Sequence, residues 1–135
     1  MAGCVLRASG VAFPVDKFLR RSSFTPCLIW HTGEKRLTAR SKRTDSGFNL
    51  MVSEALDLPS QVQETIDFLK HCRKELLRLK NTPGIDNLLL DFGILRRDVA
   101  AQFDCFPVEL VRLAGTFGMA LELSQYLSSG PERIK

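Results

Sequence analysis

The chain has 135 residues, of which 44% are hydrophobic and 25% are charged, as expected for one globular domain. No run approaches the roughly 20 apolar residues that span a bilayer. The first residues lack the basic start and the long apolar core of a signal peptide. We therefore expect a single domain over residues 1–135, located in the cytoplasm.

The net charge of +4 is spread unevenly along the chain. Residues 1–46 carry a net charge of +6, whereas residues 47–135 carry a net charge of −2. Half of this +6 lies in residues 34–46, which carry five Lys or Arg against Glu34 and Asp45, so a surface that attracts anions is expected near this segment.

The first part of the chain predicts two strands around a short helix. Residues 4–9 are apolar and partly alternating, which favours a strand, and residues 27–31 form a second apolar run. Between them, Pro14 suits the first turn of a helix that extends to about Arg21. Gly33 then begins a turn.

Residues 34–46 predict a long mobile hairpin loop. Leu37 is their only large apolar side chain, so the segment cannot bury enough surface to offset the entropy of ordering it. Gly47 ends the loop, and alternating apolar residues predict a third strand over residues 48–52.

The longest predicted element is a helix from Pro59 to Lys80. Its apolar residues recur at steps of three and four, which is the spacing of one helical face. Residues 81–84 end it with a proline and a flexible glycine turn. A face of this length needs a sheet to cover, so we expect a core helix. The stripe consists of Val62, Ile66, Leu69, Cys72, Leu76 and Leu79.

Two more strands and one more helix are predicted in the last third of the chain. The strands cover residues 87–94 and 119–124, and the helix covers residues 104–117, with Pro107 at its start. Residues 96–103 form at most one helical turn, and residues 128–135 form a frayed tail. The residues expected to face the core are Leu88, Leu90, Phe92 and Ile94 on the first strand, Val108, Val111 and Leu113 or Ala114 on the helix, and Met119, Leu121 and Leu123 on the last strand.

This order of elements predicts an α+β fold. Strands that alternate with helices around one central hairpin favour a ferredoxin-like (split βαβ) antiparallel sheet with helices on one face. The order is βαββαβ plus an additional αβ, and right-handed crossovers make this the simplest closure.

Several short features occur along the chain in a fixed order and spacing: Phe13-Pro14, Pro26, Trp30, Gly33-Glu34, Gly47-Phe48 and the Gly118 turn into Leu121-Glu122-Leu123. Their order and spacing resemble a small bacterial α+β family known as domain of unknown function 4279. The resemblance covers roughly residues 3–128 and implies a fold; the family offers no activity.

The four cysteines are scattered and form no CxxC pair, and the two histidines fall at no spacing typical of a zinc site. Buried free thiols are therefore expected, with no metal and no cofactor. Cys27 and His31 lie about 13 Å apart along one strand and cannot form a nucleophile–base pair. Sequence alone leaves a pairing of Cys27 with His71 open. Because no catalytic motif is present, we do not expect an enzyme.

The basic loop is the first candidate site. Its cations could neutralise phosphates and bind nucleic acid weakly. However, no aromatic residue is interleaved among them to stack bases, so a solvated loop is favoured. The cations are Lys35, Arg36, Arg40, Lys42 and Arg43.

The sheet face opposite the helices is the second candidate. Strand alternation places polar side chains from several strands on this face. It is expected to be wet or covered by another subunit, and a small-ligand site is the alternative. Asp91 and Glu122 would form a carboxylate pair for acid–base catalysis if their strands were neighbours. The face comprises Arg7, Ser9, Asn49, Met51, Asp91, Glu122, Ser124 and Tyr126.

Three functions follow from these candidates. The first is a non-enzymatic domain that binds another protein or itself through the sheet face or its edge. The second is a small-ligand-binding or enzymatic role on the same face. The third is weak nucleic-acid binding through the basic loop. A membrane role is not expected.

Overall fold

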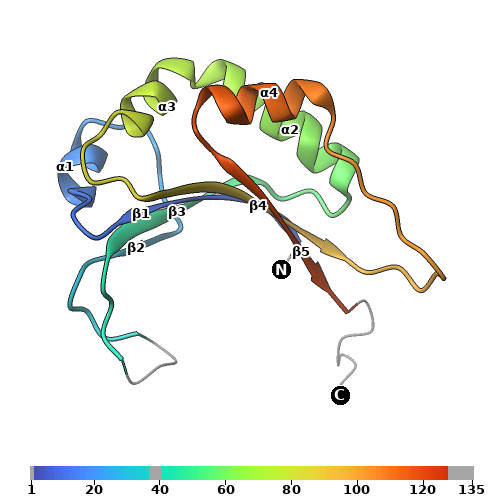
Figure 1. The fold of residues 1–135 in the computed structure, drawn as a ribbon, viewed down its shortest axis with the longest axis horizontal. Helices are drawn as coiled ribbons and strands as arrows, with labels where there is room; N and C mark the ends of the chain where they lie inside the picture. The colour runs from blue at the N-terminus through green and yellow to red at the C-terminus, as the bar shows by residue number, and fades with distance from the viewer. Residues whose placement is uncertain (1, 37–40, 128–135) are drawn as a thin grey trace.

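Strand β1 (Gly3–Gly10) lies in the middle of a five-stranded sheet in the computed structural model, which describes residues 2–36 and 41–127 (Figure 1). The strand order is β2-β3-β1-β4-β5. The tail predicted over residues 128–135 lies outside the described residues. The other strands are β2 (Leu28–Trp30), β3 (Ser46–Ser53), β4 (Asn87–Leu95) and β5 (Ala120–Tyr126).

Four helices lie on one side of this sheet, and the other side faces away from them (Figure 1). The chain is therefore α+β, as predicted. The helices are α1 (Val15–Arg20), α2 (Leu58–His71), α3 (Arg73–Lys80) and α4 (Val108–Thr116). Within the described ranges, none of them combines the length and hydrophobicity that a bilayer crossing requires.

The sheet is mixed, whereas the sequence analysis predicted an antiparallel one. Strand β1 pairs antiparallel with both β3 and β4, but β5 pairs parallel with β4. The reason is the connection between β4 and β5, which contains α4 and returns the chain to the end of the sheet from which β4 began. A crossover of this length is what a parallel pair requires.

The helix predicted over residues 59–80 is two helices. Cys72 has non-helical dihedrals, with φ −101° and ψ 25°, and it ends α2 and precedes α3. The change of direction keeps both halves of the apolar stripe in the core, because Leu69, Leu76 and Leu79 are each fully buried. A straight helix of this length would diverge from a twisted sheet. Asp57 caps the start of α2 by accepting a hydrogen bond from Ser60 N at 2.9 Å.

The predicted inner face of α4 is confirmed at Ala114 but wrong at Val108 and Val111. Leu110 and Ala114 are buried, whereas Val108 and Val111 remain 68% and 49% exposed. The large ring of Phe117, fully buried one turn further on, sets the rotation of the helix. Leu110, Ala114 and Phe117 share one helical face because their spacing is four and three.

Residues 96–106 contain no helical turn. They form an irregular segment that extends from the end of β4 to α4 (Figure 1). Phe106 packs against Phe92 with ring centroids 5.0 Å apart, and it anchors the end of the segment on the sheet. Phe103 is 87% exposed.

The four cysteines are free, as expected, but only Cys4 is fully buried. Burial raises the pKa of its thiol to about 12, so Cys4 remains a protonated, apolar core residue. Cys72 is half-buried, and burial raises its pKa as well. Cys27 and Cys105 are exposed.

Replacing Leu69 by Ala should lower the free energy of unfolding by about 2–5 kcal/mol, because Leu69 is fully buried and the change leaves a cavity under α2. Val111→Ala is the matched control, because Val111 is half-exposed on α4 and should cost under about 0.5 kcal/mol. Urea unfolding of the three proteins measures both values. Equal midpoints for Leu69→Ala and the parent would contradict the packing described here.

Candidate functional site

A row of hydrogen-bonded polar side chains crosses four strands on the face of the sheet that the helices leave open. Arg7 on β1 donates from Nη2 to Asp91 Oδ2 on β4 at 2.9 Å. Ser124 on β5 donates to the other oxygen of Asp91 at 2.7 Å. On β3, the Asn49 amide oxygen accepts from Arg7 Nη1 at 2.8 Å when the amide is oriented to satisfy its neighbours. Four predicted site residues are therefore joined in one network.

Asp91 is not the freely exposed carboxylate that the sequence analysis expected. It points to the open face, but only 7% of the residue is exposed, because Arg7 and Ser124 cover it. Charge-assisted hydrogen bonds to both carboxylate oxygens hold the side chain in place. This geometry favours a structural connection between β1, β4 and β5 over a group that is available to a substrate.

The strands of Asp91 and Glu122 are neighbours, and the two residues are partners in the parallel register. Glu122 is exposed, whereas Asp91 is bonded to Arg7 and Ser124. Asp91 therefore contacts these two residues and not Glu122, whereas the acid–base hypothesis requires the two carboxylates to interact directly. Tyr126 lies further along β5, opposite Leu95 of β4, and is 40% exposed.

Half-exposed apolar side chains surround this polar row. They come from the four strands other than the central one, and the register places them on the same side as Asn49 and Arg7. Exposed fractions of 39–45% are large for side chains of this type, so the face is amphipathic. The residues are Leu28 at 40%, Met51 at 39%, Leu95 at 45% and Tyr126 at 40%.

The base of the basic loop is a structured hairpin. Lys35 and Lys42 form an antiparallel bridge, and Arg43 exchanges backbone hydrogen bonds with Gly33 and Glu34. The Arg43 guanidinium lies 4.9 Å from the centre of the Trp30 ring. The aromatic ring nearest the loop therefore already holds a cation on one face, which disfavours base stacking there. Lys35, Arg36 and Lys42 are exposed, and Arg40 lies outside the described residues.

Cys27 and His31 do not form a catalytic pair. The Cys27 thiol donates to the backbone oxygen of Asn49 at 3.4 Å. Both ring nitrogens of His31 contact carboxylates instead, as described next. The hypothesis that Cys27 pairs with a histidine base has no support from these contacts.

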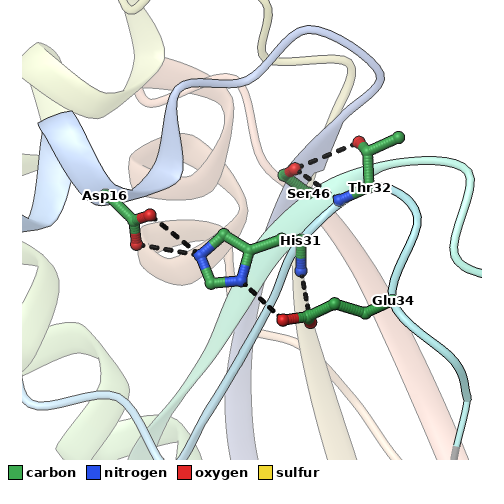
Figure 2. Close-up of polar contacts among 5 residues, drawn as sticks. All are labelled: Asp16, His31, Thr32, Glu34 and Ser46. Atoms are coloured by element: carbon green, nitrogen blue, oxygen red, sulfur yellow. Dashed lines mark hydrogen bonds and ion pairs between the residues drawn. The ribbon is translucent and has the colours of Figure 1, made fainter.

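His31 forms a cluster that the sequence analysis missed. Its Nε2 lies 2.9 Å from both carboxylate oxygens of Asp16 on α1, and its Nδ1 lies 3.0 Å from Glu34 Oε2 (Figure 2). Glu34 also accepts from the His31 backbone N–H at 2.8 Å. The imidazole therefore joins α1 to the turn that follows β2. The spacing of His31 and Glu34 around Gly33 was a weak signal in the sequence, but Asp16 gave none.

This cluster, called here the His31 clasp, is an imidazole held between two carboxylates and is not a metal site. Asp16 and Glu34 contact opposite nitrogens of the ring, so they cannot bind one ion together with it (Figure 2). Within residues 2–36 and 41–127, no three His, Cys, Asp or Glu side chains come together in a way that could hold a metal ion. Hydrogen bonds to Asp16, and then to Glu34, raise the pKa of His31 above 6.5. The hydrogen bond from the His31 backbone N–H lowers the pKa of Glu34.

Comparisons with protein-family models, with curated proteins and with solved structures found no match to this chain. The resemblance to the domain of unknown function 4279 family therefore stays a prediction.

Replacing Asp16 by Asn should lower the pKa of His31, and by more than Glu34→Gln does, because Asp16 makes the larger contribution. The folded-state pKa of His31 lies above its unfolded value. The stability that the clasp adds is therefore full below about pH 6.5, provided that Asp16 is ionised above about pH 4, and is lost as pH rises through the raised pKa.

NMR titration of the His31 ring gives the pKa in each protein, and thermal melts from about pH 5 to 9 give the stability difference. The melting difference between parent and Asp16→Asn should shrink toward high pH. Asp98→Asn, in the irregular segment after β4, is the control for removing one carboxylate. An unchanged His31 pKa in Asp16→Asn would show that the clasp does not form in solution.

Proposed function

We propose that this chain is a non-enzymatic protein-binding domain and that its open sheet face is the surface that contacts the partner. The observation that carries the proposal is the amphipathic character of that face. Leu28, Met51, Leu95 and Tyr126 are 39–45% exposed around a polar row that is already satisfied internally. Apolar surface with few unpaired charges is what the core of a protein interface requires.

The size of the face supports this proposal. Five strands about 4.8 Å apart, with about seven residues each at about 3.3 Å, give a projected area on the order of 500 Å². The accessible area exceeds this projection because side chains roughen the surface. A standard interface buries about 800 Å² on each partner, so the open face can supply most of the area that one partner contributes.

The internal satisfaction of Arg7 and Asp91 also favours a protein partner over a small polar ligand. A ligand that entered here would have to displace an ion pair whose Asp91 oxygens both have donors. A second protein chain can cover the row without breaking it. The first partner to test is a second copy, because an open sheet face is commonly covered by a subunit of the same kind.

We further propose that β1 to β4 form the ferredoxin-like unit expected from the sequence, to which α4 and β5 are added. The order β2-β3-β1-β4 and the antiparallel pairing of these four strands support that assignment. In this arrangement β5 extends the open face by one strand and contributes Tyr126.

Replacing Leu28 and Tyr126 together by Lys should weaken self-association at least about tenfold, because two desolvated charges would face the partner. Val108→Lys with Val111→Lys is the matched control. It adds the same charge at two exposed valines of α4, on the helical side of the sheet. Asp91 is left unchanged, because its replacement would strand Arg7 and confuse a folding defect with a binding defect.

Sedimentation velocity at increasing protein concentration measures association, and thermal melts check folding. We expect the parent and the α4 variant to associate alike and the sheet-face variant to remain monomeric with a nearly unchanged melt. A parent that is monomeric at about 1 mM would overturn self-association. If self-association weakens equally in both variants, the added positive charge itself, and not its position on the sheet face, weakens association.

A further inference from the structure

A cavity of about 450 Å³ lies between α1 and the turn that joins α3 to β4. Figure 1 shows these segments side by side at the end of the sheet where β4 begins. The volume falls within the range of small-ligand sites, about 300–1,000 Å³. The cavity is lined by Ala12, Pro14, Lys17, Phe18, Arg21, Arg78, Thr82, Pro83 and Gly84.

Three of the lining side chains are cationic. Lys17 lies on α1, Arg21 is the first residue after α1, and Arg78 lies on α3. Glu75 bonds Arg78 at 3.1 Å and offsets one charge. Within the described part of the chain, Lys17 and Arg21 form no ion pair, and the neighbouring Asp16 is bound to His31 (Figure 2). The cavity therefore carries an excess of positive charge that no described carboxylate neutralises.

Arg78 is held in place before any ligand arrives. Its Nη2 donates to the backbone oxygens of Phe18 and Arg21, both at 3.1 Å, and to Glu75. Its guanidinium lies 4.0 Å from the centre of the Phe18 ring. All of these hydrogen bonds use Nη2. Among the described contacts, Nε and Nη1 of Arg78 donate to no acceptor, so both remain available to a ligand. A fixed guanidinium fork suits carboxylate and phosphate oxygens.

Apart from Thr82, the remaining wall of the cavity is apolar. Phe18, Pro14 and Pro83 supply hydrophobic surface beside the cations. The turn at Gly84 has φ +97°, and a Cβ atom there would meet Ala12 O at 2.3 Å. The turn is therefore pressed against the chain before α1, and only glycine allows this approach.

We propose that this cavity binds a small organic anion, in which a carboxylate or phosphate group is attached to a flat apolar body. The anionic group contacts Lys17, Arg21 and the free donors of Arg78, and the apolar body packs against the prolines. The site shares no residue with the open sheet face, so it is independent of the protein-binding proposal.

A purely structural explanation accounts for part of this arrangement. Arg78 joins the end of α1 to α3 through the two backbone oxygens, and that contact needs no ligand. It does not account for Lys17 and Arg21, which bring two further cations to the same cavity. Both side chains are exposed, so solvent screens the repulsion between them, and their combined positive potential favours an anion in the cavity.

Isothermal titration of the full chain with phenyl phosphate, benzoate, inorganic phosphate and benzyl alcohol tests the proposal. We expect saturable binding of phenyl phosphate or benzoate. Binding of inorganic phosphate and of neutral benzyl alcohol should be at least about tenfold weaker, because each lacks one half of the recognised chemistry. The ratio of the two aryl anions tells phosphate from carboxylate.

Lys17→Ala with Arg21→Ala should weaken binding of the preferred aryl anion at least about tenfold, since two charge-assisted contacts are lost. Arg20→Ala with Lys74→Ala is the control. It removes the same charge from exposed positions of α1 and α3 that do not line the cavity, and binding should change less than about twofold. No saturable binding of either aryl anion up to about 10 mM would overturn the proposal, and so would equal losses in the two variants.

Discussion

The packing of α2 against the middle of the sheet is the interaction on which the rest of the structure depends. Leu69 of α2 and Leu6 and Ala8 of β1 are fully excluded from solvent, and Gln61 of α2 donates to the backbone oxygens of Ala55 and Gly93 at 2.9 Å each. This buried amide bonds the start of α2 to β4. It therefore fixes both the position of α2 and which of its faces contacts the sheet. Because α1 to α4 all cover this side of the sheet, the opposite face has to be stabilised by other contacts.

That opposite face is stabilised by polar pairing at its centre. Arg7 lies between Asn49 and Asp91, and Ser124 completes the row. The adjacent strands β3, β1, β4 and β5 are therefore joined by side-chain hydrogen bonds as well as by backbone ones. Removing either charge would leave the other one partly buried and unpaired, which costs more than the pair contributes. The same row leaves the apolar side chains around it free to meet another surface.

The sequence predicted the elements whose signals are local and periodic. Alternation on β4 placed Leu90 and Phe92 in the core, and both are fully buried. The pattern was less reliable for α4, where two overlapping sets of apolar residues fit a helix. There the choice depends on Phe117, because burying a whole aromatic ring outweighs leaving two valines exposed. The parallel pairing of β5 likewise depends on the path of a connection that carries no clear pattern.

The sequence predicted which face of the sheet the candidate residues occupy. It did not predict the contacts that join distant parts of the chain. Alternation placed Arg7 and Asp91 on one face, although it did not show that they are bonded to each other. The clasp at His31 and the contact of Arg78 with α1 join residues 15 and 57–60 positions apart. No spacing rule covers such distances, so only the fold brings these side chains together.

The fold also changes what the charge asymmetry means. Residues 1–46 carry a net charge of +6, which in the sequence suggests one basic surface. In the structure, four of these cations occupy three separate environments. Arg7 is paired on the open face, Arg43 lies over Trp30, and Lys17 and Arg21 line the cavity beside α1. A nucleic-acid surface needs its cations aligned along a continuous track. Cations that are divided in this way fit a chain with several small, distinct contact sites better than one broad polyanion surface.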